Sequence, residues 1–211
     1  MKEIKSSKRD INNQQNRDKL FHAMNQIIEK YDYNTVTIRN LCTVSGVSYG
    51  SFYNLFKTKE NFLCYYLSHD FVLYMDQYYS ARSAEFNALN PMEKSIDIFE
   101  CCAQYNIEKG LKFVSAFYSS RNFSLFADPD CPEQEYSFTP LLNLAREYLT
   151  QAKEQQILKQ DADVEYLIHV YTYIFNGITF NWCISQGKVN IVQEVHRCLK
   201  ALLVPYTAAV E

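Results

Sequence analysis

The chain has 211 residues and a mass of 24.8 kDa, which is enough to form a hydrophobic core without disulfides. Apolar residues make up 47% and charged residues 21%, with only five glycines and five prolines, so the composition excludes disordered, collagen-like and low-complexity proteins. The formal net charge is −3, but residues 1–60 carry ten Lys or Arg against six Asp or Glu. The remainder is acidic, so a nucleic-acid contact is expected only within residues 1–60.

The seven cysteines are irregularly spaced and no hydrophobic signal segment opens the chain, which predicts a reducing, cytoplasmic environment. The most apolar stretch, residues 167–184, contains His169, Asn176 and Asn181. These polar residues recur too often for a membrane span. We therefore expect a buried helix there and no membrane partner.

In the basic N-terminal part of the chain, apolar positions recur every three or four residues, which predicts helices. The first helix is expected from Gln14 to Lys30. Thr37 is a suitable N-cap for a short helix that ends near Ser45, where Gly46 can adopt the left-handed conformation.

A second short helix is expected after Ser48, whose side-chain oxygen can cap it, with Phe52 and Phe56 on one face. Thr58 caps a long helix that keeps one apolar face for about five turns, to Tyr79.

The rest of the chain is also predicted to be helical. Residues 126–140 hold three prolines and four acidic residues, which favours a long loop. No strand pattern appears, so we predict an all-α fold of about nine helices. Beyond the long helix, the expected helices are residues 91–109, 113–120, 141–155, 161–186 and 191–203.

Residues 36–56, VTIRNLCTVSGVSYGSFYNLF, are the most informative segment. Two short helices joined by a tight turn containing glycine form a helix-turn-helix, whose second helix enters the DNA major groove. Tyr53 can place its hydroxyl on a phosphate, and Lys59 adds a positive charge beside the N-terminus of the next helix. The polar face of the second helix carries Ser48, Tyr49, Ser51 and Asn54, with Gly50 allowing a close approach.

The span from about Arg17 to Leu67, roughly a quarter of the chain, resembles the DNA-binding domain of TetR-family transcriptional regulators, and the matching stretch is TVTIRNLCTVSGVSYGSFYNLFKTKENFL. It departs from the family pattern at Cys42, Thr43 and Leu55. The resemblance implies a DNA-binding domain over residues 1–57, with its N-terminal arm, and an effector-binding and dimerisation domain over 58–211, linked by the helix from about residue 58. The residues expected to bind DNA are Thr37, Arg39, Ser48, Tyr49, Gly50, Ser51, Tyr53, Asn54 and Lys59.

The resemblance also implies that the last two helices pair with those of a second subunit as a four-helix bundle. Independently, residues 164–183 are apolar on nearly all sides, so this helix must be covered all round. The alternative is the central helix of a monomeric bundle. The residues expected at a dimer interface are Ile174, Trp182, Val195, Leu199 and Leu202.

An effector pocket is expected among aromatic and polar residues of the middle helices, because ligand pockets are mostly apolar with a few placed polar groups. The acidic excess of this half favours a neutral or cationic effector, although surface solvation explains it equally well. The expected pocket residues are Tyr105, Phe113, Phe117, Tyr118, Phe123, Tyr136, Tyr171, Phe175 and Asn176.

Patterns for catalysis, cofactors and metals are lacking. His196 and Cys198 are two residues apart on a predicted helix and cannot share a metal, and no Gly-rich phosphate loop or nucleophile elbow is present. A redox switch at Cys101, Cys102 or Cys131 is a further alternative, although acidic neighbours disfavour a reactive thiol at Cys131.

These observations predict a cytoplasmic homodimeric regulator of transcription, a repressor, that binds a pseudo-palindromic double-stranded DNA operator and responds to a small-molecule effector of unknown identity. It is expected to need no cofactor or metal. Two other classes stay open. One is a helical small-molecule-binding protein without DNA function, and the other is an enzyme built in the bundle.

Overall fold

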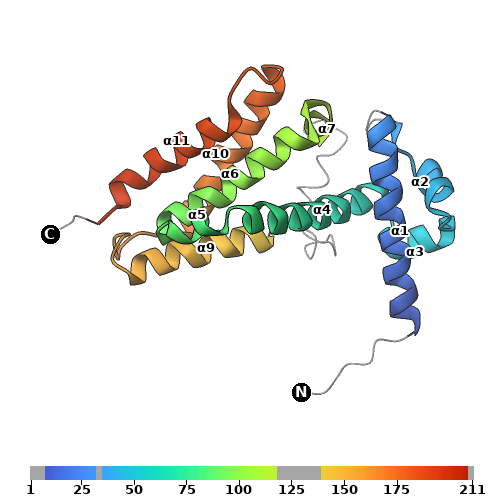
Figure 1. Cartoon of the computed structure of the whole chain (residues 1–211), viewed down its shortest axis with the longest axis horizontal. Coiled ribbons are helices and arrows are strands. Elements are labelled where there is room, and N and C mark those ends of the chain that lie inside the picture. The colour runs from blue at the N-terminus through green and yellow to red at the C-terminus, as the bar shows by residue number, and fades with distance from the viewer. Residues whose placement is uncertain (1–7, 32–34, 118–138, 209–211) are drawn as a thin grey trace. The chain divides into compact units, whose positions relative to one another are not determined.

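The structure, a computed structural model, describes residues 8–31, 35–117 and 139–208, except for the side chains at 64, 116–117 and 139–140 (Figure 1). Within these residues it contains ten α-helices, one short 3-10 helix and no β-strand. The all-α prediction is confirmed. The described residues up to Leu67 form one compact unit, and those from Ser68 onward form a second.

The first unit contains α1 (Lys8–Lys30), α2 (Ile38–Ser45), α3 (Tyr49–Phe56) and the first turns of α4 (Lys59–Ala81). Its core is aromatic. The ring of Phe52 lies 5.7 Å from that of Phe56 and 5.8 Å from that of Phe62, and all three are almost fully buried. Tyr66 donates its hydroxyl to Asn25 Oδ1 at 2.7 Å, which joins α4 to α1.

Helix α1 begins at Lys8, six residues before the predicted start at Gln14. The added residues 8–13 are mostly polar and exposed, and the single apolar residue among them, Ile11, forms no apolar periodicity that a sequence pattern could detect. Directly after them, side chains one turn apart form hydrogen bonds along the helix, such as Gln14 Nε2 donating to Asp18 Oδ1 at 2.8 Å.

The second unit is built around α6 (Pro91–Lys109), which packs against both α9 (Thr139–Glu154) and α11 (Ile191–Leu203). Helix α10 (Val164–Ile184) packs against α9, α11 and α7 (Leu111–Phe117), and the chain turns through the 3-10 helix η4 (Val204–Tyr206) (Figure 1). Helix α6 is buried along most of its length, including Ile98, Phe99 and the polar residues Ser95 and Asp97.

Local sequence signals explain most boundaries in this unit. Asn90 forms a capping box with Glu93, followed by Pro91 in the first turn of α6. Gly110 ends α6 with φ +86°, a conformation that favours glycine. Helix α11 has the bounds that its apolar periodicity predicts, whereas α9 begins at Thr139, inside the segment predicted to be a loop.

One helix is absent from the prediction. Helix α4 ends at Ala81, and α5 (Ser83–Ala88) follows after Arg82. Arg82 provides no side-chain cap for α5 and instead contacts Glu85 and Asp97. No Gly or Pro marks this break, and the Arg82–Asp97 ion pair beside it joins residues that sequence periodicity does not relate. Among the described helices, none is long and apolar enough to cross a membrane.

Candidate nucleic-acid interface

The turn between α2 and α3 is built by side-chain caps and one glycine. Thr37 Oγ1 accepts from the Asn40 N–H at 3.1 Å, and Asn40 Oδ1 accepts from the Thr37 N–H at 2.8 Å. Gly46 ends α2 in the left-handed region, at φ 70° and ψ 9°. Ser48 then caps α3 by accepting from the Ser51 N–H at 3.1 Å. The predicted helix-turn-helix is therefore present.

Helix α3 has one buried and one exposed face. Phe52 and Phe56 are 0% and 1% exposed, and they fix the helix in the core of the first unit. Tyr49 and Tyr53 are 48% and 49% exposed, although large aromatic side chains usually lie mostly buried. Asn54 is exposed beside them. The sequence-predicted contact residues thus share a solvent-facing surface.

The remaining sequence-predicted contacts have defined local partners. Ser51 Oγ lies 2.9 Å from Ser48 Oγ, so both hydroxyls belong to the cap of α3. Arg39 is exposed on α2. Lys59 is the first residue of α4, directly after Thr58, whose Oγ1 accepts from the Asn61 N–H at 3.1 Å.

Gly50 is not required by the fold of this unit. A Cβ atom added there would meet only Ser48 Oγ, at 4.0 Å. A glycine within a helix costs about 0.5–1 kcal/mol relative to alanine. Packing within the chain therefore does not explain why a glycine, which leaves the surface of α3 accessible, occupies this position.

A cation that the sequence analysis did not single out lies beside this surface. Lys57 follows α3 and is exposed, and its backbone has a positive φ of 50°. The only signal in the sequence is a second lysine two positions before Lys59. At the start of α1, Lys8 and Arg9 are exposed, whereas Lys2 and Lys5 lie outside the described residues.

Three of the predicted effector residues, Tyr171, Phe175 and Tyr105, lie in two separate aromatic groups, and Phe175 is only half-buried. Tyr171 and Phe175 on α10 pack against Phe99, with ring centroids 5.3 and 5.7 Å away. Tyr105 packs instead against Phe71 on α4, at 5.1 Å. Phe113 is buried and Asn176 is exposed, while the Phe117 side chain and Tyr118, Phe123 and Tyr136 lie outside the described residues.

The hydroxyls of the two buried tyrosines are already hydrogen-bonded within the chain. Tyr105 donates to Asp70 Oδ2 at 2.6 Å, and Lys109 forms an ion pair with the same carboxylate. Tyr171 Oη lies 3.1 Å from Ser95 Oγ, and burial raises the pKa of Tyr171. A surface hollow of about 490 Å³ lies elsewhere, along the polar face of α9 between Asn143 and Glu154.

The predicted interface residues need a correction. Val195 and Leu199 are 0% exposed, because they face the core of the protomer itself, and Trp182 is 6% exposed. Ile174 and Leu202 are half-buried. The exposed apolar residues of α10 are instead Tyr166, Tyr173, Phe180 and Ile184.

Among the described residues, the cysteines and the potential metal ligands show no reactive centre. Burial raises the pKa of the Cys101 thiol to about 12 and that of Cys102 well above its usual value, which disfavours the reactive thiolate. Within the described part of the chain, no group of three His, Cys, Asp or Glu side chains could hold a metal ion. Cys131 lies outside that part.

Comparison with known proteins gives structural matches alone. No protein-family model and no curated protein matches the sequence. Thermus thermophilus FadR, a TetR-family transcriptional repressor in complex with lauroyl-CoA, superposes with a TM-score of 0.69 at 20% identity, covering 92% of this chain and 97% of that one.

Two further solved structures match over most of their length. Bacillus subtilis FadR, a transcriptional regulator in complex with stearoyl-CoA, has a TM-score of 0.52 at 15% identity, over 90% of this chain and 97% of that one. TylP of Streptomyces fradiae, a TetR regulator, has a TM-score of 0.50 at 18% identity, over 94% and 86%. At these identities the matches establish the fold.

Proposed function

We propose that this chain, which has the fold of the TetR-family transcriptional regulators, is a sequence-specific DNA-binding repressor that acts as a homodimer and responds to a small molecule. The observation that carries the proposal is the exposed row Tyr49, Gly50, Tyr53 and Asn54 on α3. In a helix-turn-helix, residues at this position contact base edges in the major groove. The net positive charge of residues 1–60 supports the same assignment.

Within this surface, different residues have different proposed roles. Tyr49 and Asn54 read bases, because an aromatic ring and an amide can contact thymine methyl groups and adenine edges. Tyr53, Lys57 and Lys59 contact phosphates, which position the protein without reading sequence. Thr37, Ser48 and Ser51 hold the helix termini with their caps, and each hydroxyl retains capacity for a phosphate contact.

The test is selection of binding sites from a randomised duplex library with the full chain. We expect enrichment of a sequence with two inverted half-sites, whose centres are about one helical turn apart or a multiple of it. Tyr49→Ala should relax the preference at one position in each half-site. Tyr31→Ala, which removes another exposed tyrosine of the same unit, is the matched control and should select the wild-type sequence. Failure of the wild-type chain to enrich any sequence would contradict the proposal.

The dimer is proposed to form through the exposed face of α10. Tyr166, Tyr173 and Phe180 recur every seven residues and are 54%, 72% and 49% exposed, and Ile184 extends the row at 61%. Large apolar side chains exposed along one helix indicate a protein interface. Paired with the same row of a second copy, and with the neighbouring exposed face of α11, it would form an interface of at least about 2,000 Å².

Effector response is assigned to the second unit and to α4. Helix α4 contributes residues to both units, and side chains of α6 hold its middle turns. Tyr74 donates to Glu108 Oε1 at 3.1 Å, near the Asp70 contacts of Tyr105 and Lys109. A ligand that changes how α4 packs on α6 would change DNA affinity, and the coupling must be reciprocal.

A further inference from the structure

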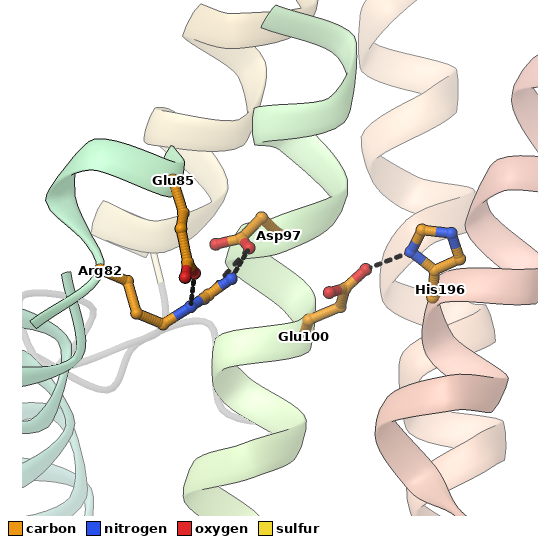
Figure 2. Close-up of polar contacts among 5 residues, drawn as sticks. All are labelled: Arg82, Glu85, Asp97, Glu100 and His196. Atoms are coloured by element: carbon orange, nitrogen blue, oxygen red, sulfur yellow. Dashed lines mark hydrogen bonds and ion pairs between the residues drawn. The ribbon is translucent and has the colours of Figure 1, made fainter. Parts of the chain in front are cut away.

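A polar cluster around the buried carboxylate of Asp97 lies in the second unit where α4, α5 and α6 meet (Figure 2). Arg82 donates from Nη1 and Nη2 to Asp97 Oδ1, at 3.3 Å each, and from Nε to Glu85 Oε2 at 3.1 Å. Asp97 is only 4% exposed. Figure 2 shows that a single oxygen of its carboxylate is engaged. Arg82 therefore hydrogen-bonds one of the two carboxylate oxygens of Asp97, Oδ1.

Two buried polar atoms in this cluster have no hydrogen-bond partner among the described residues. They are the second carboxylate oxygen of Asp97, Oδ2, and the hydroxyl oxygen of Tyr79. Burial raises the pKa of Tyr79, and the negative charge of the Asp97 carboxylate and its attraction for the hydroxyl proton raise it further. The hydroxyl thus lies close to the Asp97 carboxylate, but the two do not form a hydrogen bond of good geometry. Native proteins rarely leave buried polar atoms unpaired, because desolvation without a hydrogen bond is unfavourable.

Aromatic side chains pack against the ring of Tyr79. The ring of Tyr79 packs against Phe86 with centroids 4.5 Å apart, and Phe86 lies 6.0 Å from the ring of Tyr148. Lys94 places its ammonium over Phe86 and Tyr148, at 5.4 and 5.7 Å, and in the described part of the chain it forms no ion pair with Asp97. The group that would complete the cluster is therefore a hydrogen-bond donor beside an aromatic surface.

Helix α5 offers a way into this site. It has six residues, none of which is buried, and its N-terminus lacks a side-chain cap. Few buried contacts make a segment open locally at low cost. Opening of α5 would move Glu85 and Phe86 and expose Asp97 and Tyr79.

We propose that Asp97 and Tyr79 bind the ammonium group of a small aromatic amine, which donates to Asp97 Oδ2 and to the Tyr79 hydroxyl while its ring packs beside Phe86. A carboxylate or phosphate headgroup would meet the unpaired carboxylate oxygen and be repelled. The inference rests on the proposed function in one respect, that the amine is the effector of the regulator. Its chemistry differs from that of the acyl-CoA molecules bound to the two FadR structures.

The test is calorimetric titration of the full chain with three matched probes, 2-phenylethylamine, 2-phenylethanol and phenylacetate, near pH 7. All three join a phenyl ring to a polar head through a short carbon chain, and they differ in the charge and donor capacity of the head. We expect 2-phenylethylamine to bind most tightly, the alcohol more weakly, and phenylacetate not at all. No binding of the amine, or equal binding of phenylacetate, would overturn the proposal.

Two variants and a control locate the site. Asp97→Asn can keep the contact with Arg82 while placing an amide donor where Oδ2 stands, so amine affinity should fall by about tenfold or more. Tyr79→Phe removes one hydroxyl and should weaken the amine by a few-fold, roughly 3–10. Glu100→Gln makes the same acid-to-amide change on α6 but on the side facing His196, whose Nδ1 lies 2.6 Å from Glu100 Oε1 (Figure 2), and should leave affinity unchanged.

Thermal unfolding of each variant, followed by circular dichroism, checks that the variant folds. If Asp97→Asn does not fold, the amine affinity of Tyr79→Phe tests the site. Equal amine affinity for wild type and a folded variant would mean that buried water, or a direct bond between the two atoms, satisfies them, and the proposal would be wrong. The titrations contain no DNA, so their failure leaves the DNA-binding function standing. Conversely, a chain that binds the amine but selects no DNA sequence would retain this site and lose the regulator assignment.

Discussion

A substitution at Gly50 is expected to affect protein stability and DNA binding in opposite directions. The chain leaves room for a methyl group there, so Gly50→Ala should raise the free energy of unfolding of the first unit by about 0.5–1 kcal/mol. The same methyl group would meet DNA at the surface of α3 and should weaken operator binding. Chemical denaturation and fluorescence anisotropy on the same sample measure both effects. A more stable variant with undiminished DNA affinity would remove Gly50 from the interface.

Lys59 is expected to act on phosphate and not on sequence. Lys59→Ala should weaken binding to all duplexes alike and reduce the slope of log affinity against log salt by about 1, because one fewer counterion is released. Lys188→Ala, at an exposed lysine of the second unit, should change neither quantity. A changed base preference with an intact salt slope would contradict the phosphate role.

At the scale of helices, substitutions in α10 and α11 distinguish the proposed dimer face from the core of the protomer. Tyr173 is 72% exposed, so Tyr173→Asp should alter protomer stability by no more than about 0.5 kcal/mol while shifting sedimentation at micromolar concentration from dimer to monomer. Leu199 is 0% exposed, so Leu199→Asp should destabilise the protomer by at least about 3 kcal/mol. A Tyr173→Asp chain that remains fully dimeric would contradict the proposed face.

These two helices also show what periodicity can and cannot predict. The residues Ile191, Val195, Leu199 and Leu203 recur every four positions and are all buried, so the pattern predicts the bounds of α11. It does not say which partner buries them, and in the structure Val195 and Leu199 are buried inside the protomer. Helix α10 is apolar on opposite sides, which indicates two partners without assigning either one.

The helix-turn-helix was predictable because its signals are local. Thr37, Gly46 and Ser48 act through bonds to residues three or four positions away, which a sequence displays directly. The Arg82–Asp97 pair joins residues 15 positions apart, and the break between α4 and α5 that accompanies it has no local marker. Sequence reasoning consequently located the candidate DNA surface and missed the buried polar cluster.

At the scale of the whole molecule, a dimer must contact two half-sites on the same face of the DNA. Inserting five base pairs between the half-sites of the selected operator rotates one by about half a turn relative to the other. We expect this insertion to reduce the affinity close to that of a single half-site. Gel-shift titration measures the loss, and unchanged affinity would show that the two recognition helices do not bind together.

The most direct test of the central claim is the affinity of the full chain for its selected duplex and for a shuffled duplex of the same composition, measured by anisotropy at physiological salt. A sequence-specific regulator should bind the selected duplex at least about 10³-fold more tightly. Equal affinities, falling with salt in parallel, would show that the basic first unit binds DNA only through its charge and would contradict the account.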